Sequence, residues 1–163
     1  MQIKVKKLHK DAIIPKYQTS GAACFDIHAL IDENDPRGFY VIDAKIKRVT
    51  MGVGSGVSDT EIYRTGLSFE IPEGYVMVVY SRSGHGFKND VRLANCVGVI
   101  DSDYRGELMV KLTADSNSYG LTVSDGDRIA QAMIIPVQQV SFEEVSELSD
   151  TIRGEGGFGS SGR

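Results

Sequence analysis

One acidic turn in the sequence has the residue types needed for acid–base chemistry. It lies in the stretch ANCVGVIDSDYRGEL, residues 94–108, where Asp101, Asp103, Tyr104 and Arg105 separate two segments of alternating apolar residues. A hairpin in this stretch places Asp101 at the end of an apolar strand, half shielded from water. A carboxylate in that position can accept a proton from an attacking water molecule. The same residues also suit an ordinary polar turn, so this stretch alone leaves both interpretations open.

A second segment has the residue types of an anion site. In YSRSGHG, residues 80–86, Arg82 supplies a planar fork of donors that suits phosphate oxygens. Ser83 adds a hydroxyl group, and Gly84 lets backbone amides approach an anion closely. A surface turn after a buried strand explains the same residues.

Three polar residues interrupt apolar runs and therefore need partners. Gln131 lies in IAQAMII, where an amide without a hydrogen bond costs roughly 1–3 kcal/mol. The Gln131 side chain either forms hydrogen bonds with neighbouring backbone or points at a ligand or a subunit interface. Asn95 is expected on the inward face of a strand over residues 91–99. Asp26, in ACFDIHAL, is either exposed to solvent or directed at a metal-bound water molecule.

Several well-known site motifs are missing from the sequence. A phosphate-binding loop of the Walker type needs a lysine after its glycines and a helix behind it, and the glycine-rich C-terminus has neither. A zinc deaminase needs His-x-Glu, whereas His28 is followed by Ala29 and Leu30. No nucleophile elbow for a Ser-His-Asp triad is present either.

The composition is that of an ordinary globular domain. The 163 residues are 41% hydrophobic and 25% charged, which suits one domain with its own core. The net charge of -4 disfavours a broad nucleic-acid-binding face. Two distant cysteines, Cys24 and Cys96, indicate a reducing, intracellular compartment. No stretch approaches ~20 apolar residues, and the basic N-terminus lacks an apolar signal core, so neither a membrane span nor secretion is expected.

Hydrophobic residues recur mainly with a period of two, which predicts an all-β sandwich or barrel. The expected strands cover residues 40–47, 67–71, 91–99 and 108–112, with the apolar runs at 75–80 and 129–137 buried on both sides. Turns are expected at IDENDPRG, IPEG and SDGD. A short helix fits SRSGHGFKND, residues 81–90, where a serine can cap the first turn.

Two segments have unusual compositions. Residues 38–64 include TMGVGSGVSDTE, which is rich in Gly, Ser and Thr and forms either a long surface hairpin or a partner-binding insertion. The C-terminus RGEGGFGSSGR, residues 153–163, cannot build a core and contains one large aromatic ring. It is either an unfolded leftover or a flap that orders over a ligand.

Taken together and in order, five short stretches resemble the five motifs of the trimeric dUTP pyrophosphatases (dUTPases). They are GAACFDIHA, SRSG, NCVGVIDSDYRGEL, GDRIAQ and RGEGGFGSSG. The resemblance runs from about Ser20 to Arg163, although residues 31–64 fit poorly. Each stretch alone is a weak signal, whereas all five in this order are a strong one.

The resemblance implies a distorted β-barrel of jelly-roll type and a C3 homotrimer with three active sites at subunit interfaces. It divides the chain into a barrel over residues 1–152, with an atypical insertion at about 38–64, and a flexible flap over 153–163. It implies Mg²⁺-dependent hydrolysis of dUTP to dUMP and pyrophosphate, which lowers dUTP and supplies dUMP for thymidylate synthesis. A cytoplasmic enzyme is expected, with no nucleic-acid or membrane partner.

The resemblance also implies a role for each matched position of the barrel. Asp101 is the general base toward the α-phosphorus, Tyr104 lies against the deoxyribose, and Asp26 orients the metal through a coordinated water molecule. The residues expected to hold the phosphate chain are Arg82, Ser83, Gly84 and Gln131. Those expected to read the uracil edge are the Asn95 side chain and the backbone of Gly98, Ile100 and Met109.

In the flap, the resemblance implies that Phe158 stacks on the uracil ring, while Arg153, Ser160 and Ser161 contact phosphates. The flap glycines, among them Gly159, permit close wrapping around the substrate. Ordering so flexible a segment costs conformational entropy. The flap is therefore expected to close only over a complete nucleoside triphosphate.

The sequence departs from the family pattern at a few positions, and rival functions stay open. Ser81 stands where proline is frequent, Cys24 stands where glycine is common, and His85 with Gly86 replaces a small apolar pair. One rival is a dCTP deaminase of the same fold, which releases ammonia from dCTP. The other is a non-catalytic trimeric jelly-roll protein, which hydrolyses nothing.

Overall fold

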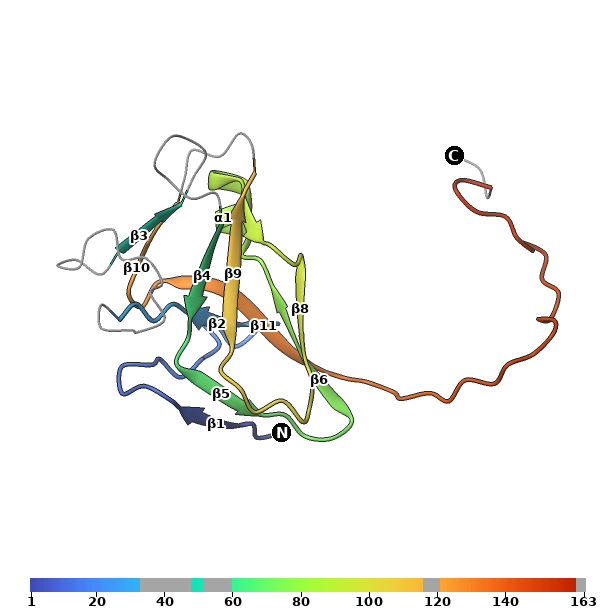
Figure 1. The fold of residues 1–163 in the computed structure, drawn as a ribbon, viewed down its shortest axis with the longest axis horizontal. Helices are drawn as coiled ribbons and strands as arrows, with labels where there is room; N and C mark the ends of the chain where they lie inside the picture. The colour runs from blue at the N-terminus through green and yellow to red at the C-terminus, as the bar shows by residue number, and fades with distance from the viewer. Residues whose placement is uncertain (33–47, 52–59, 116–120, 161–163) are drawn as a thin grey trace.

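A computed structural model describes residues 1–32, 48–51, 60–115 and 121–160. Within these residues the chain forms β-strands and one short helix (Figure 1), which confirms the predicted all-β class. In chain order the elements are β1 Lys4–Lys7, β2 Phe25–His28, β3 Arg48–Met51, β4 Thr60–Arg64, β5 Leu67–Glu70, β6 Tyr75–Tyr80, α1 Ser83–Asn89, β7 Val91–Leu93, β8 Val97–Ile100, β9 Met109–Ala114, β10 Leu121–Ser124 and β11 Arg128–Pro136.

The strands form a jelly-roll type of β-barrel built from small antiparallel sheets. A four-stranded sheet has the order β2-β11-β6-β8, and a three-stranded sheet has the order β4-β9-β7. Two further pairs, β1 with β5 and β3 with β10, extend the barrel. Alternate side chains of each strand point inward, and those of Ile27, Met77, Leu112 and Ile129 are at most 1% exposed in the core.

Several predicted strands are confirmed. The runs YVMVVY and IAQAMIIPV form β6 and β11, the two central strands of the four-stranded sheet. Central strands are covered on both faces, which explains why Met77, Val78 and Val79 are buried in succession. The alternation at Leu108, Val110 and Leu112 leads into β9, and all three side chains are at most 3% exposed.

The prediction of one strand over residues 91–99 is wrong. The chain forms β7 in the sheet with β9, turns at residues 94–96, and continues as β8 in the sheet with β6. Cys96 adopts a left-handed backbone with φ of 62°, which reverses the chain direction there. Because of this turn, Asn95 is exposed and does not lie on an inward strand face.

The predicted helix is confirmed as α1, but a serine does not cap it. Arg82 occupies the N-cap position with extended backbone, and no side-chain hydrogen bond caps the first turn. At the other end Asp90 adopts a left-handed conformation with φ of 51°, and its single backbone N–H donates back to the carbonyl oxygens of Gly86 and His85. The helix therefore begins directly after the arginine of the second motif.

Some sequence predictions fall on residues outside the described ranges. The strand expected at residues 40–47 does so, as does most of the segment 38–64. The described parts of that segment belong to the barrel sheets, because β3 pairs with β10 and β4 pairs with β9. The turns at IPEG and SDGD are confirmed between β5 and β6 and between β10 and β11.

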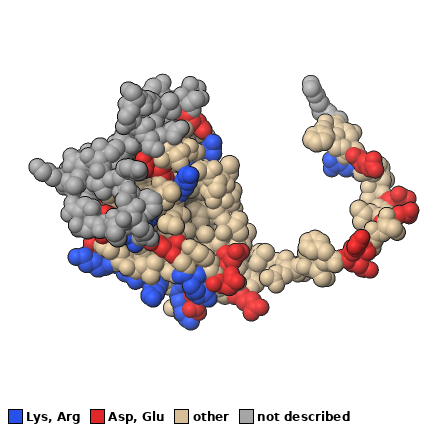
Figure 2. Space-filling model, viewed as in Figure 1, with Lys and Arg blue, Asp and Glu red and all other residues tan. Residues whose placement is uncertain are grey.

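The chain leaves the barrel after Pro136. Residues 137–160 contain no strand or helix and extend away from the barrel (Figure 1). This tail exposes large apolar side chains, with Phe142 95% and Leu148 88% exposed. In the view of Figure 2 the tail is rich in carboxylates, whereas lysines and arginines gather at the barrel end that bears β1. The tail thus begins well before the glycine-rich segment at residues 153–163.

Both cysteines, Cys24 and Cys96, are free thiols. Among the described residues, none of the helical structure is long and apolar enough to cross a membrane.

Candidate active site

Asp26 lies at the centre of a cluster of charged side chains. Its Oδ1 is 3.3 Å from Nε of Arg82, and its Oδ2 is 3.2 Å from Nη1 of Arg128. The residue is only 8% exposed, so the interpretation of Asp26 as a solvent-exposed residue is wrong. We call Asp26, Arg82, His85, Arg128 and Gln131 the Arg82 cluster.

Strand register explains why these residues meet. Asp26 on β2 pairs with Gln131 on β11, and Gln131 pairs on its other side with Tyr80 at the end of β6. A register shift between Arg128 and Ala130 marks a β-bulge, a feature that redirects side chains near functional sites. The first, second and fourth motifs are therefore assembled on three neighbouring strands.

The Gln131 side chain bonds backbone. Its Nε2 donates to the Ser81 carbonyl at 2.9 Å, which ties β11 to the segment that leads into α1. Ser83 and Gly84 begin α1 and are exposed. The structure thus brings Arg82, Ser83, Gly84 and Gln131 to one end of β6, as their expected shared role requires.

His85, for which the sequence offered no explanation, has a definite place in this cluster. Its Nε2 is 2.8 Å from the Arg128 carbonyl oxygen, and Nη1 of Arg82 donates to the same oxygen at 3.1 Å. Because a carbonyl oxygen only accepts hydrogen bonds, Nε2 of His85 is the donor. Arg128 was also missed, and the only sequence signal for it was its place inside GDRIAQ.

His28 lies close to the same cluster but adds no charge to it. Burial lowers the pKa of His28, and this effect outweighs the opposite pull of the nearby Asp26 carboxylate. Its Nδ1 is buried and has no hydrogen-bond partner among the described residues. The neutral ring leaves the two guanidinium groups to balance Asp26.

A cleft of about 450 Å³ lies between β8 and β9. The prediction of a hairpin in this stretch is wrong in one respect, since β8 pairs with β6 whereas β9 pairs with β4 and β7. The two strands therefore separate and open a space between them. The expected uracil-reading residues line it together: Asn95, Gly98, Ile100 and Met109.

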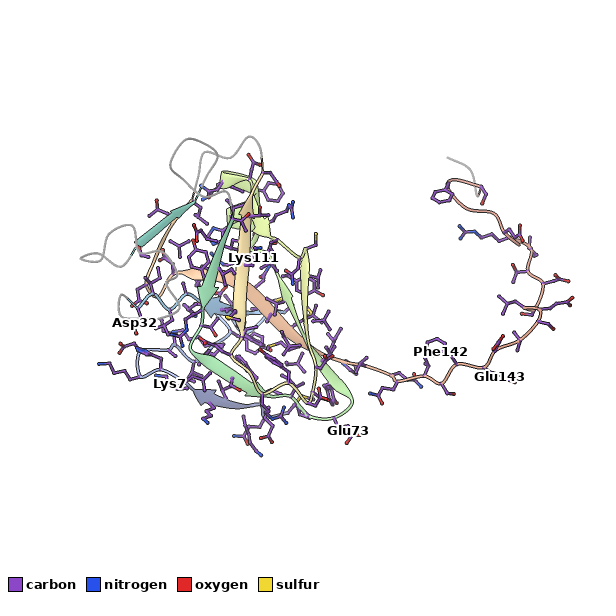
Figure 3. The ribbon with its side chains drawn as sticks, in the orientation of Figure 1. Lys7, Asp32, Glu73, Lys111, Phe142 and Glu143 are labelled. Atoms are coloured by element: carbon purple, nitrogen blue, oxygen red, sulfur yellow. The ribbon has the colours of Figure 1, made fainter. Side chains whose placement is uncertain are left out.

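Local contacts shape this cleft. Next to Asn95, the Ala94 N–H donates to the Lys111 carbonyl at 2.9 Å and joins the two walls. At Gly98, an added Cβ atom would lie 3.1 Å from the Val79 Cβ, a tight contact that favours glycine. Figure 3 shows Lys111 on β9, far from Phe142 and Glu143 on the tail.

Asp101 directly follows β8, where the cleft continues into a smaller pocket of about 270 Å³. Asp101, Tyr104 and Met109 line this pocket. The expectation that Asp101 is half shielded is wrong for the single chain, where the residue is exposed. The Tyr104 hydroxyl donates to the Glu107 carbonyl at 3.1 Å.

The two parts of the site lie at opposite ends of β6. Asp101 comes one residue after Ile100, which pairs with Met77, whereas Arg82 comes two residues after Tyr80, which pairs with Val97. At about 3.3 Å per residue, the two positions are roughly 20 Å apart along the strand direction. Within one chain, therefore, Asp101 and the Arg82 cluster are separate.

The tail residues meet neither part. Phe158 is fully exposed, and Nε of Arg153 donates only to the nearby Gly156 carbonyl at 2.7 Å. Ser160 lies in a local turn with Gly157, and Gly159 has φ of 95°. Ser161 falls outside the described residues.

The arrangement of these motifs agrees with comparisons to known proteins. The dUTPase family model matches residues 52–162. The chain belongs to the dUTPase family. A deoxyuridine 5'-triphosphate nucleotidohydrolase of Nautilia profundicola is 44% identical, and the match covers 100% of both chains. The enzyme of the same name from Helicobacter hepaticus is 45% identical, with 99% of this chain and 89% of the relative covered.

Solved dUTPase structures have the same fold. A dUTPase of Staphylococcus bacteriophage 80alpha with dUPNHPP matches with a TM-score of 0.75 and 26% identity. The match covers 99% of each chain. The family resemblance seen in the five motifs is thereby confirmed over the whole chain.

Proposed function

We propose that the protein hydrolyses dUTP to dUMP and pyrophosphate by attack of water on the α-phosphorus. The observation that carries this proposal is the position of Asp101, next to a cleft lined by the residues suited to read uracil. The carboxylate takes a proton from water as the water oxygen bonds to the α-phosphorus. The bond from that phosphorus to the oxygen bridging the α- and β-phosphates breaks, and pyrophosphate leaves.

The β8–β9 cleft is the proposed uracil site. The Asn95 amide both donates and accepts hydrogen bonds, and the backbone of Gly98, Ile100 and Met109 adds groups of both kinds. Cytosine reverses the donor and acceptor pattern at one ring edge, so it leaves hydrogen-bonding groups of the site unpaired. A site of this kind discriminates strongly against the wrong base.

The Arg82 cluster is the proposed site for the phosphate chain. A guanidinium group has five N–H donors, and the contacts to Asp26 and the Arg128 carbonyl use only some of those on Arg82. The remaining donors suit phosphate oxygens, as do the Ser83 hydroxyl and the Gly84 backbone amide at the start of α1. Gln131 supports this site by holding the Ser81 carbonyl.

Magnesium fits the proposed site as an ion carried by the substrate. The described residues contain no group of three or more His, Cys, Asp or Glu side chains able to hold a metal. Mg²⁺ at nucleotide sites is bound mainly by phosphates and water, with one or two carboxylates. Each Asp26 oxygen faces one arginine but keeps lone pairs for a metal-bound water molecule. When bound, the ion offsets the negative charge of the phosphate chain.

We propose that the working enzyme is a homotrimer with shared sites. One dUTP molecule has to meet both Asp101 and the Arg82 cluster, which lie at opposite ends of β6 in a single chain. A neighbouring subunit that supplies one of the two parts resolves this separation. Exposed apolar side chains near the Asp101 turn, including Val99 at 62% and Met109 at 48%, offer a surface for such contact.

The glycine-rich segment at residues 153–163 is the proposed flap. The position of residues 153–160 away from the barrel supports a role at a site on another subunit. Stacking of Phe158 on the uracil ring is worth about 1–3 kcal/mol by analogy with other base–aromatic contacts. Arg153, Ser160 and Ser161 then contact phosphates, and closure excludes bulk water from the reacting atoms.

The rest of the domain assignment is also part of the proposal. The proposed catalytic domain covers residues 1–152, which are the barrel and the first part of the tail. The segment 38–64 is the proposed insertion, and its described strands, β3 and β4, join the barrel sheets. The two free thiols support a reducing, intracellular compartment.

A product assay in ¹⁸O-labelled water tests the proposal. The protein is incubated with dUTP or dCTP, in the presence of magnesium or of a chelator. We expect dUMP and pyrophosphate from dUTP with magnesium only, and the label in dUMP because water attacks the α-phosphorus. Ammonia release from dCTP, label in pyrophosphate, or no turnover of dUTP would each overturn the assignment.

A further inference from the structure

Tyr104 lies directly over the backbone of Gly106 in the turn between β8 and β9. A Cβ atom added to Gly106 would be 2.5 Å from Cζ of Tyr104 and 2.9 Å from its Cε2, and it would also overlap the hydroxyl oxygen. Carbon atoms that are not bonded do not approach so closely, since they pack at about 3.5–4.0 Å. Any side chain at position 106 is therefore incompatible with the observed place of the ring.

The backbone itself does not require glycine at this position. Gly106 is absent from the described glycines with positive φ, such as Gly66 and Gly74, so its conformation is one that other residues adopt. The three atoms nearest to the added Cβ all belong to the Tyr104 side chain, so the contact with this ring is what favours glycine.

The ring is held at one end by its hydroxyl group, which donates to the Glu107 carbonyl at 3.1 Å. Glu107 is in turn fixed to the barrel. Its carboxylate oxygens each lie 3.1 Å from Nε of Arg64, and one of them accepts the Gly66 N–H at 2.8 Å. Tyr104 is 43% exposed, so contacts in the turn hold the ring rather than a surrounding core.

We infer that Gly106 is a specificity-determining positioning residue, which allows Tyr104 to form the wall against the sugar of the nucleotide. This inference rests on the proposed function and deepens it. Without a Cβ at position 106, the ring lies against the turn and its hydroxyl reaches Glu107. With a Cβ, the ring leaves this position and the anchor is lost. In the proposed function Tyr104, which lines the pocket beside Asp101, lies against the deoxyribose and leaves no room for a 2′-hydroxyl, so a displaced ring no longer excludes that group.

The test is the ratio of kcat/KM for dUTP to that for UTP in the Gly106→Ala variant. We expect this ratio to fall by roughly tenfold or more, since pockets reject one extra small group by about 10–200-fold. The kcat for dUTP should stay within a few-fold of that of the unmodified protein, because Asp101 is unchanged. The fold should survive, because the displaced atoms are the end of a partly exposed side chain. An unchanged ratio would overturn the inference.

Matched variants separate this role from a general structural one. Gly21→Ala serves as control, because a Cβ there meets nothing within 4 Å, and it should keep the ratio. Tyr104→Ala should lower the ratio of kcat/KM for dUTP to that for UTP to the same extent as Gly106→Ala. Adding Gly106→Ala to Tyr104→Ala should then change nothing further. A full additional effect in the double variant would show that Gly106 does not act through Tyr104.

Two further measurements keep the test decisive. If Gly106→Ala does not fold, Tyr104→Phe removes the Glu107 anchor without adding volume, and it should lower the same ratio. A ratio equal to that of the unmodified protein would contradict the inference. If the unmodified protein does not turn over dUTP, the proposed function fails by itself. A crystal structure of Gly106→Ala then still tests the ring position without any substrate, and a ring that stays on the Glu107 carbonyl would overturn the claim.

Discussion

At the scale of single residues, partners decide what each charged side chain can do. Asp26 and Asp101 are both carboxylates, but Asp26 interrupts an apolar run of the sequence whereas Asp101 lies in a polar turn. Asp26 is buried between two arginines, whereas Asp101 is exposed beside an open cleft. Both oxygens of Asp26 already contact guanidinium groups, whereas Asp101 is open to an attacking water molecule. The base is therefore better assigned to Asp101.

Replacing Asp101 tests this assignment directly. We expect Asp101→Asn to lower kcat by about 10²–10⁴-fold or more, the usual contribution of a general base, because an amide cannot accept the proton from water. Binding of a non-hydrolysable dUTP analogue, measured by calorimetry, should survive, since shape and hydrogen bonds are kept. Asp103→Asn is the matched control in the same turn and should leave kcat unchanged. Turnover retained in Asp101→Asn excludes the residue as the base.

At the scale of elements, side-chain contacts join α1 to β11 across the end of β6. Gln131 on β11 holds the Ser81 carbonyl, and His85 on α1 holds the Arg128 carbonyl at the bulge of β11. Both bonds fix the segment that bears Arg82. The spacing of the proposed phosphate-binding groups thus depends on contacts between elements that are far apart in sequence.

Replacing His85 measures the value of this connection. We expect His85→Ala to raise the KM for dUTP about 2–10-fold, because one neutral hydrogen bond contributes roughly 0.5–1.5 kcal/mol. The kcat should change little, since Asp101 is on another element. His85→Gln keeps an N–H donor and should restore most of the lost affinity. Steady-state kinetics on both variants provide the measurement, and a KM unaffected by His85→Ala would show that the contact plays no part in substrate binding.

At the scale of the whole molecule, the barrel and its tail are separate in the single chain. The barrel has its own core and its strands are paired, whereas residues 137–160 expose large apolar side chains and lie apart from it. Folding of the barrel should therefore not depend on the glycine-rich end. Catalysis should depend on it, because the turn at Asp101 is open to water in the single chain.

Deletion of residues 153–163 separates folding from catalysis. We expect the truncated protein to keep its melting temperature and its oligomeric state within experimental error. The rate of dUTP hydrolysis should fall by at least about tenfold, since the flap no longer excludes water or stacks on the base. Thermal unfolding, light scattering and product assays measure the three quantities. An undiminished rate would show that the tail is not a flap.

Mixed trimers test whether sites are shared. Asp101→Asn and Arg82→Ala subunits are each expected to be inactive, but a mixed trimer has one site with both residues intact. Random mixing in equal amounts should restore roughly a quarter of the activity of the unmodified protein, since about three quarters of the trimers are mixed and each has one working site of three. If one subunit supplied both residues, mixing would restore nothing.

Much of the fold could be predicted because its signals are local. Alternating side chains mark β5 and β9, continuous apolar runs mark β6 and β11, and the glycine and aspartate turns between strands are equally short-range signals. The ordered motifs also predicted the chemistry, since each brings its functional groups in one short stretch. The sequence by itself therefore determined the all-β class, the family and the candidate site residues.

Only the tertiary structure decided which of these residues meet. It divided residues 91–99 between two sheets, because the left-handed turn at Cys96 sends the chain from one sheet to the other. It placed Asp26 between the side chains of two arginines and placed the Tyr104 ring over Gly106. It also separated Asp101 from Arg82 along β6. Apart from the local contact of Tyr104 with Gly106, these outcomes depend on pairings between segments that are far apart in sequence. The periodicity of apolar residues along the chain does not say which segments pair.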